Sequence, residues 1–297
     1  MPDGFLLIDK QGGCTSHDLV ATVRRAIRVK KVGHAGTLDP MATGLVVLGI
    51  GRATRLLRFV QELDKEYVTV VAFGVATDTL DADGAVVTRE PMEFEEPDLR
   101  SVLPRFVGTI LQVPPMVSAL KLGGRRLYEL ARRGEEVERE ARAVIVHRLE
   151  LLDFCPGPYP EATIRVRCGK GTYVRSLADD LAGALGGRAH LSSLRRTRIG
   201  SLDVESAGVA LEEVEQAVEE DRWERLLLAP AEGLTDLPGQ QVPPEVARGV
   251  RSGMRFAGGL APEVPEGTPF RVLDDEGRLL AVYRAAAGSA TPEVVLS

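Results

Sequence analysis

The sequence predicts an α+β fold, with a mixed, largely antiparallel sheet flanked by helices and loops and a small β-module at the C-terminus. Segments with strand periodicity and segments with helix periodicity do not alternate regularly, as they would in a parallel α/β fold. Residues 67–77 have the β-branched density of a central strand, and proline and glycine become frequent after Leu237. We therefore expect a large domain over residues 1–235 and a small one over 236–297.

The first third of the chain gives clear signals for strands and for one long helix. Thr15 and Asp18 have the spacing of a helix capping box, and apolar residues recur every fourth position behind them. The predicted elements are a strand at 4–9, a helix through Arg28, a strand at 44–50, a short helix at 53–61 and a strand at 67–77 that ends in a turn at 78–84.

The remainder of the chain continues the mixed pattern and contains one long insertion. Residues 163–171 alternate apolar and charged side chains, which is typical of a strand with one buried face. Residues 121–142 combine a Gly-Gly pair with alternating charges, and we expect a basic insertion that becomes ordered on a charged ligand. The other predicted elements are a helix at 97–106, strands at 143–154 and 163–171, helices at 172–186 and 211–220, and a hairpin at 270–284.

Composition and motif spacing exclude several classes of protein. The sequence holds no run of about 20 apolar residues, and its N-terminus lacks the basic start of a signal peptide, so we expect a cytoplasmic protein without membrane contact. Three cysteines without Cys-x-x-Cys spacing and four scattered histidines indicate neither a disulfide framework nor a metal site. Glycines at 49–51 and 168–172 lack the residues that dinucleotide and P-loop motifs require, so no cofactor is expected.

The net charge of −6 conceals an asymmetry along the chain. Residues 24–58 contain eight Lys or Arg and one acid, and residues 165–200 contain eight Lys or Arg and two acids. Residues 201–297, in contrast, contain eight arginines and eighteen acidic residues. A chain polarised in this way can bind a polyanion on one face, which indicates nucleic acid, although individual arginines can equally be solvated surface residues.

The segment GTLDPMATG, residues 36–44, is the best candidate for a catalytic site. It holds a single carboxylate, Asp39, inside the first basic block, and Pro40 disfavours a helical conformation at Asp39. Glycines at both ends permit tight turns or the close approach of a ligand. Taken alone, the segment fits an Asp-Pro turn even better, with the carboxylate capping its own backbone.

Four segments, in order, resemble the bacterial tRNA pseudouridine-55 synthase family of the TruB type. They are GFLLIDKQGGCTSHDLV (4–20), KVGHAGTLDPMATGLVVLGIGRATR (31–55), DKEYVTVVAFGVATDTLDADG (64–84) and GTYVRSLADDL (171–181) with HLSSLRRTRIG (190–200). Residues 113–142 are similar to the long thumb-like insertion of that family, and the C-terminal residues resemble a PUA-type RNA-binding module. Apart from this module, the resemblance covers residues 4–232.

The resemblance implies a fold of the pseudouridine synthase type and an isomerase that needs neither cofactor nor metal. Its substrate would be uridine 55 in the T-loop of tRNA, held by a monomer through the T-arm. Asp39 falls on the family's catalytic aspartate, Tyr67 on the tyrosine that stacks on the flipped uracil, and Arg175 on the arginine that pairs with the aspartate.

Four further positions match substrate-binding positions of the family. Tyr173 and Leu194 fall on residues that line the pocket, and His34 falls on the histidine that occupies the space left by the extruded base. Lys65 belongs to the same motif as the stacking tyrosine.

The chemistry of the catalytic candidates can also be argued without the family. Breaking the glycosidic bond and rejoining the base through carbon needs a nucleophile or charge stabiliser beside C1′ or C6, and a fixed carboxylate is either. A base inside folded tRNA must first be flipped out. An aromatic face such as that of Tyr67 recovers about 1–3 kcal/mol of stacking, and a guanidinium beside Asp39 favours its ionised form.

Two positions depart from the family pattern, and two other functions stay open at this point. Gln11 stands where the family has proline, and Val117 stands where it has tyrosine; we expect both changes to alter packing and not the chemistry, although loss of the tyrosine hydroxyl could change contacts of the insertion. The chain could instead be a non-catalytic RNA-binding protein that only grips the T-loop. It could also be a small-molecule hydrolase, for which the sequence offers one convergent acid where two are normally needed.

Overall fold

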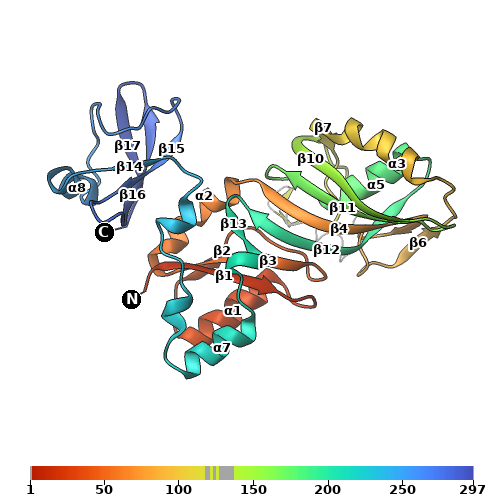
Figure 1. Cartoon of the computed structure of the whole chain (residues 1–297), viewed down its shortest axis with the longest axis horizontal. Helices are drawn as coiled ribbons and strands as arrows, with labels where there is room; N and C mark the ends of the chain where they lie inside the picture. Colours follow the sequence, from red (N-terminus) through yellow and green to blue (C-terminus); the bar gives the residue numbers. More distant parts are fainter. Residues whose placement is uncertain (1, 118–120, 123–124, 127–136, 297) are drawn as a thin grey trace.

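The computed structural model describes residues 2–117, 121–122, 125–126 and 137–296. Figure 1 shows a long twisted sheet with helices at both of its ends, and a separate small sheet that ends at the C-terminus. The elements up to residue 126 are β1 (Gly4–Lys10), α1 (Ser16–Ile27), β2 (Val32–His34), β3 (Thr43–Ile50), η1 (Gly51–Arg55), α2 (Leu57–Glu62), β4 (Lys65–Phe73), β5 (Val75–Thr77), β6 (Val86–Arg89), α3 (Glu96–Val102), η2 (Leu103–Phe106), β7 (Gly108–Gln112), β8 (Lys121–Leu122) and β9 (Arg125–Arg126).

The second half of the chain completes the main sheet and forms the small one. Its elements are β10 (Arg142–Cys155), β11 (Glu161–Cys168), α5 (Val174–Ala184), β12 (Ala189–Ile199), β13 (Leu202–Asp203), α6 (Val204–Ala207), α7 (Leu211–Glu219), η3 (Trp223–Leu226), η4 (Glu232–Leu234), β14 (Gly239–Gln241), α8 (Pro244–Arg251), β15 (Pro269–Leu273), β16 (Leu279–Ala286) and β17 (Ser289–Val295).

The main sheet confirms the predicted fold class. Within the described residues it has nine strands, in the order β1-β3-β12-β4-β11-β10-β7, with β2 on β3 and β13 on β12. All of these pairings are antiparallel except that between β12 and β3. A sheet of this kind does not need a helix after each strand, which is why helix and strand signals do not alternate in the sequence.

Local signals set the N-terminal elements as expected. The capping box between Thr15 and Asp18 is present at the start of α1, whose apolar stripe is buried. β1 is buried on both faces: Leu6 and Ile8 pack in the core that includes α1, and Phe5 and Leu7 pack in the core that includes α2. A short strand without polar alternation is typical of this double burial.

Two strand predictions need correction. The strand expected at 67–77 is broken at Gly74, whose φ of +83° turns the chain so that β5 pairs with β6 instead of continuing β4. A further strand, β12, was not predicted; it lies between β3 and β4 in the main sheet. Irregular register at Leu191/Ser193 and at Arg196/Arg198 interrupts the alternation of its apolar residues, so the period of two is hidden.

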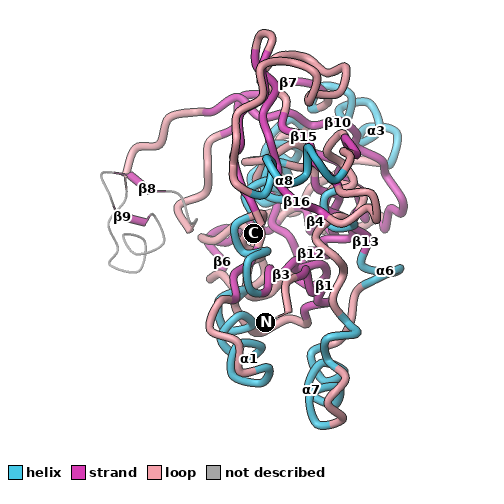
Figure 2. Tube along the Cα trace, turned by 90° about the vertical axis from the view of Figure 1, so that its left-hand side faces the viewer, coloured by secondary structure: helices cyan, strands magenta, loops and turns pink. Residues whose placement is uncertain are grey.

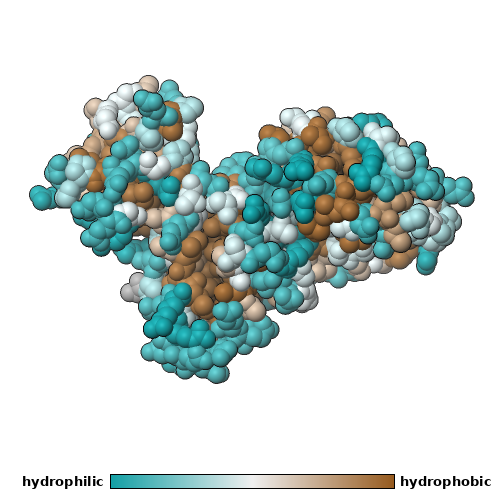
Figure 3. Space-filling view, viewed as in Figure 1, coloured by the Kyte–Doolittle hydropathy of each residue, from teal (hydrophilic) through white to brown (hydrophobic). Residues whose placement is uncertain are grey.

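The C-terminal β-module is a four-stranded sheet in the order β14-β15-β16-β17, and the hairpin predicted at 270–284 is β15 with β16. Its residues Leu279, Val282 and Val294 share a buried core with Leu57 and Val60 of α2. In Figure 3 mostly hydrophilic surface covers the outer edge of this module, and apolar surface gathers over the far end of the main sheet.

The insertion expected at 113–142 lies partly outside the described residues. Of its central part the structure describes β8 and β9, an antiparallel pair that stands apart from the main sheet in Figure 2. None of the helices in the described part of the chain has the length and apolar character needed to cross a membrane.

Candidate active site

Asp39 lies in the loop between β2 and β3, and buried side chains from other segments hold this loop. The ammonium of Lys10, which is only 1% exposed, donates to the carbonyl of Pro40 at 3.0 Å and to that of Ala42. Ser16 accepts from the Leu38 amide at 2.9 Å. The loop is therefore fixed on both sides of Asp39, as a catalytic loop must be to hold a side chain in one geometry.

The guanidinium of Arg175 pairs with Asp39 across 136 residues of sequence. Arg175 Nε lies 3.0 Å from Asp39 Oδ2, and Nη2 lies 3.2 Å from Oδ1, so two nitrogens face the two oxygens. The Arg175 side chain is 4% exposed and that of Asp39 is 32% exposed. The pair is thus open on the side of the carboxylate, where a ligand could approach it.

A second carboxylate, Asp81, shares the same guanidinium. Its Oδ2 lies 3.2 Å from Arg175 Nη1, and its other oxygen accepts from Thr79 Oγ1 and from the Asp83 amide. Its side chain is 6% exposed. One convergent acid was predicted from the sequence, and the structure brings two together. Because Asp81 is buried and already hydrogen-bonded, it holds Arg175 in place and does not face the solvent.

The backbone completes the surroundings of Arg175. Nη1 donates to the carbonyl of Thr79 at 2.8 Å, and Nη2 donates to the carbonyl of Val117 at 2.8 Å. Because Val117 contributes its main-chain oxygen, its departure from the family's tyrosine leaves this contact in place.

Burial raises the pKa of the Asp39 carboxyl above its usual value. Arg175 opposes the rise, Asp81 adds to it, and the charges of Arg196 and Lys10 lower it. The Asp39 charge is therefore poorly solvated and depends on these cations.

Tyr67 lies on β4, where it pairs with Val166 of β11 on one side and with Arg196 of β12 on the other. It packs against the main core, and burial raises the pKa of its hydroxyl, with Arg196 opposing the rise and Asp39 adding to it. Tyr67 is thus near enough to Asp39 for their charges to interact, and its hydroxyl is protonated at neutral pH.

Tyr173 and Leu194 occupy different depths. Tyr173 precedes α5 directly, and its amide and carbonyl are held by the side chain of Gln112 at 2.8 and 3.1 Å. Because Tyr173 lies two residues before Arg175, the same helix start positions both. Leu194 is 6% exposed and belongs to the main core on β12.

His34 and Lys65 each lie at the end of a strand, of β2 and β4 respectively. His34 ends β2; its Nδ1 is buried without a hydrogen-bond partner among the described residues, and burial lowers the pKa of the ring. The ammonium of Lys65 donates to the carbonyls of Gln61 and Leu63, and burial lowers its pKa to about 8. In this position Lys65 fixes the turn between α2 and β4.

The structure thus pairs Asp39 with Arg175, places Tyr67 where its charge interacts with that of Asp39, and adds three residues that sequence reasoning missed. These are Asp81, Lys10 and Arg196. Asp81 lies in a segment interpreted as a turn and as part of a family motif, and Arg196 lies in a basic block interpreted as a polyanion-binding face. Lys10 lies in the first family-like segment and was given no role. A buried position for a charged residue leaves no local signal in a single sequence, because it depends on partners that are far away along the chain.

Part of the first basic block is used within the chain. Arg52 and Arg55 donate to the carbonyls of Leu296 and Val295. Arg58 pairs with Glu293 at 2.9 Å. These three arginines contact the end of the C-terminal module, so the face available to a polyanion is smaller than the charge pattern indicates.

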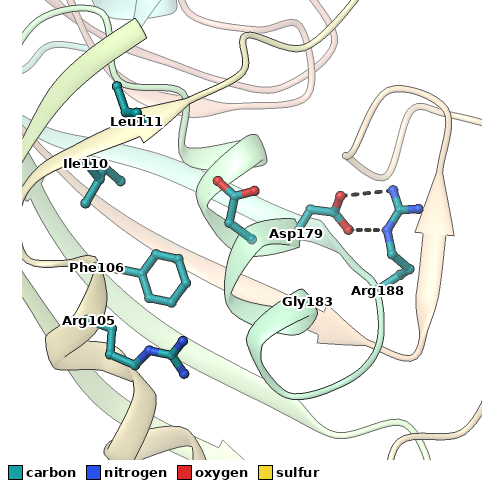
Figure 4. Close-up of a pocket in the computed structure, with 8 residues that line it drawn as sticks. Arg105, Phe106, Ile110, Leu111, Asp179, Gly183 and Arg188 are labelled. Carbon is teal, nitrogen blue, oxygen red and sulfur yellow. Dashed lines mark hydrogen bonds and ion pairs between the residues drawn. The ribbon is translucent and has the colours of Figure 1, made fainter. Parts of the chain in front are cut away.

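A cavity of about 670 Å³ lies at a different place, between η2, β7 and α5. Figure 4 shows Asp179 and Arg188 paired on one side, with Phe106, Ile110 and Leu111 on the other. Asp39 does not line this cavity. Among the described residues no three His, Cys, Asp or Glu side chains are placed to hold a metal ion.

Comparisons with known proteins identify the family. The family model of the "TruB family pseudouridylate synthase (N terminal domain)" matches residues 24–174, and that of the "tRNA pseudouridylate synthase B C-terminal domain" matches residues 175–235. The chain belongs to the TruB family of pseudouridylate synthases. It is therefore an isomerase, and the hydrolase alternative is wrong.

Relatives of this TruB family member match it over most of its length. A protein named tRNA pseudouridine synthase B from Moorella thermoacetica is 46% identical over 287 residues, covering 95% of this chain and 93% of the relative. Proteins of the same name from Symbiobacterium thermophilum and Burkholderia pseudomallei are 50% identical over 263 residues and 44% identical over 295 residues. They cover 88% and 98% of this chain, and 84% and 96% of the relatives.

Solved structures show the same fold at lower identity. The crystal structure of a Cbf5-Nop10-Gar1 complex contains a chain with a TM-score of 0.80 and 24% identity, covering 99% of the TruB family chain and 85% of that chain. A chain in the H/ACA RNP bound to a substrate RNA containing 2′-deoxyuridine has a TM-score of 0.78 and 23% identity, with coverage of 99% and 85%. The predicted pseudouridine synthase fold is confirmed.

Proposed function

We propose that this protein converts uridine 55 in the T-loop of tRNA to pseudouridine, with Asp39 as the catalytic carboxylate. The observation that carries the proposal is the Asp39–Arg175 pair, in which a buried cation holds a carboxylate whose open side faces outward. The names of the relatives supply tRNA as the substrate class. The position in the T-loop comes from the family resemblance of the GTLDPMATG segment.

The reaction exchanges one bond to C1′ for another without a change in composition. The N1–C1′ bond breaks, the base turns, and a C5–C1′ bond forms; the proton on C5 leaves, and N1 gains a proton. Asp39 can serve this sequence by attack at C1′, by attack at C6, or by stabilising charge on a glycal route. In each case the carboxylate must be ionised, which Arg175 favours by its charge.

The other site residues act on the flipped base. Tyr67 stacks on the uracil, while Tyr173 and Leu194 line the pocket. Tyr67 was also a candidate to remove the C5 proton, but the raised pKa of its hydroxyl disfavours the deprotonated form that a base requires. His34 fills the space left by the extruded base; its half-buried ring, kept neutral by a lowered pKa, suits insertion among stacked bases. Lys65 supports substrate binding without touching the substrate, because it fixes the start of β4, which carries Tyr67.

The RNA is held by a wider surface than the pocket. We assign this role to the remaining basic residues of the two blocks, to the insertion at 113–142 and to residues 236–297 as a second, PUA-like domain. The protein acts as a monomer on the T-arm. Because phosphate contacts release counterions, affinity for tRNA falls steeply as the salt concentration rises.

The test uses an unmodified tRNA transcript and mapping of pseudouridine after incubation with the purified protein. Wild-type protein forms pseudouridine at position 55, and a transcript with cytidine at that position is left unmodified. Modification elsewhere in the tRNA would contradict the proposed position.

Asp39→Asn tests the catalytic assignment and separates the enzyme from a protein that only grips the T-loop. The variant forms no detectable pseudouridine but binds tRNA within about twofold of wild type, because the amide keeps the shape and loses the charge. The melting temperature of the variant is measured alongside, because Asp39 is one of the two carboxylates that pair with the buried Arg175. Full activity in Asp39→Asn would end the assignment.

A further inference from the structure

Arg196 on β12 is the largest fully buried side chain among the described residues, at 1% exposure. It has no carboxylate within ion-pair distance in the described part of the chain. Its guanidinium donates instead to backbone carbonyls: Nε to Leu45 at 2.7 Å, Nη1 to Thr37 at 3.4 Å and Nη2 to Gly36 at 3.4 Å. Burying a cation among neutral partners costs free energy of folding. An arginine at this place therefore indicates a functional role.

These contacts grip the Asp39 loop at both ends. Gly36 and Thr37 precede Asp39, and Leu45 follows it. The backbone of Arg196 also pairs with Gly44, in the parallel contact between β12 and β3. A Cβ on Gly44 would lie 2.2 Å from the Arg196 carbonyl oxygen, so a glycine is required for this approach.

Arg196 also faces the stacking tyrosine. Arg196 and Tyr67 are Cα partners across β12 and β4, and directly opposed residues of antiparallel strands place their side chains on the same face. Burial raises the pKa of Tyr67, and the charge of Arg196 opposes that rise. One guanidinium therefore bonds to the loop that carries Asp39 and lies on the same face of the sheet as the ring that would stack on the uracil.

We propose that Arg196 is a positioning residue that couples the Asp39 loop to Tyr67 and fixes the separation between carboxylate and ring. The inference rests on the proposed function. The role differs from that of Arg175, which contacts Asp39 directly, because Arg196 acts on Asp39 through the loop backbone and through its charge.

The charged groups around Asp39 come from four elements or turns. Arg175 lies on α5, Asp81 follows β5, Lys10 ends β1 and Arg196 lies on β12. The three cations lower the pKa of Asp39, and Asp81 raises it. Loss of the Arg196 charge therefore moves the ionisation of Asp39 to higher pH.

Two substitutions separate the positioning by Arg196 from its charge. Arg196→Gln lowers kcat about 100-fold, the order of loss caused by a misplacement of 1 Å, and moves the acid limb of the kcat profile to higher pH. Arg196→Lys keeps the charge but cannot reach three carbonyls, so kcat falls while the acid limb stays near its wild-type position. The measurement is the initial rate of pseudouridine formation at saturating tRNA between pH 5 and 9, which gives kcat.

Arg271→Gln is the matched control. Arg271 donates to the carbonyls of Leu237 and Ala231 in the same manner, but in the C-terminal module. Its loss lowers the melting temperature and leaves the acid limb unmoved. An Arg196→Gln variant that behaves like Arg271→Gln, with an unmoved acid limb, would overturn the inference.

A double-variant cycle tests the coupling if Arg196→Gln does not fold. Tyr67→Phe removes the hydroxyl that faces Arg196 and keeps the ring. Combined with Arg196→Lys, it lowers kcat by less than the product of the two single losses, since each breaks the same link. Losses that multiply would refute the coupling. Because every value is a ratio to wild type, this failure leaves synthesis of pseudouridine by the wild-type protein intact.

Discussion

Two groups of arginines in this protein differ in burial and in partners. Arg175 and Arg196 are 3% and 1% exposed, and each binds groups from three or more separate positions around the Asp39 loop. Arg52 and Arg58 have side chains 48% and 53% exposed, and they contact the end of the C-terminal module. Both groups come from the basic blocks of the sequence, so charge patterning alone does not separate their roles.

The difference follows from the cost of burying a charge. A buried guanidinium must be hydrogen-bonded, and removing one member of a buried ion pair leaves the other as an uncompensated charge. An exposed ion pair is screened by solvent and contributes little to the free energy of unfolding. Substitutions should therefore have large effects at the buried arginines and small ones at the interface with the module.

The largest effect is expected for Arg175→Met. The substitution removes the guanidinium that Asp39 and Asp81 share, so the free energy of unfolding falls by about 3–5 kcal/mol. Pseudouridine formation falls at least 100-fold, as estimated from the loss of fixed geometry. Chemical denaturation and single-turnover assays measure both, and activity above one tenth of wild type would show that Arg175 does not organise the site.

Asp81→Asn should have a smaller effect on stability than Arg175→Met, and it should shift the pH profile in the opposite direction to the loss of a cation. The amide preserves the volume and removes a charge, which lowers the free energy of unfolding by about 1–3 kcal/mol. Because Asp81 raises the pKa of Asp39, its loss moves the acid limb of the kcat profile to lower pH, opposite to the loss of a cation. A shift to higher pH would show that Asp81 acts only through the position of Arg175.

The pH dependence of the wild-type enzyme tests whether burial at the Asp39 site changes the ionisation of the carboxylate. Since burial raises the pKa of Asp39 and the reaction needs the carboxylate, kcat rises with pH through a midpoint above the usual range of an aspartate. A single-turnover profile over pH 4 to 8 measures this midpoint. A rate that is flat down to pH 4 would contradict a raised pKa.

The smallest effect is expected for Arg58→Ala. Its pair with Glu293 is more than half exposed on the arginine side, so the free energy of unfolding changes by at most about 1 kcal/mol. kcat and the acid limb stay at their wild-type values, and urea denaturation reports the small loss. A change in the pH profile would mean that the surface arginines are linked to the site after all.

The sequence alone determined the elements whose signals are local. The capping box of α1, the doubly buried β1 and the hairpin of β15 and β16 follow from residues a few positions apart, and the structure confirms them. Asp39 became a candidate through a local signal too, as a carboxylate between glycines and before proline, although the segment by itself fits an Asp-Pro turn better. The pairing of Arg175 with Asp39 was expected only through the family resemblance.

Tertiary structure alone decided which distant groups each arginine binds. Arg175 reaches Asp39 across 136 residues, Arg196 reaches Leu45 across 151, and Arg55 reaches Val295 across 240. β12, hidden in the sequence by its irregular register, carries Arg196 to the loop. The physical reason is that burial of a charge depends on partners gathered by the whole sheet, and neither periodicity nor spacing along one strand encodes them.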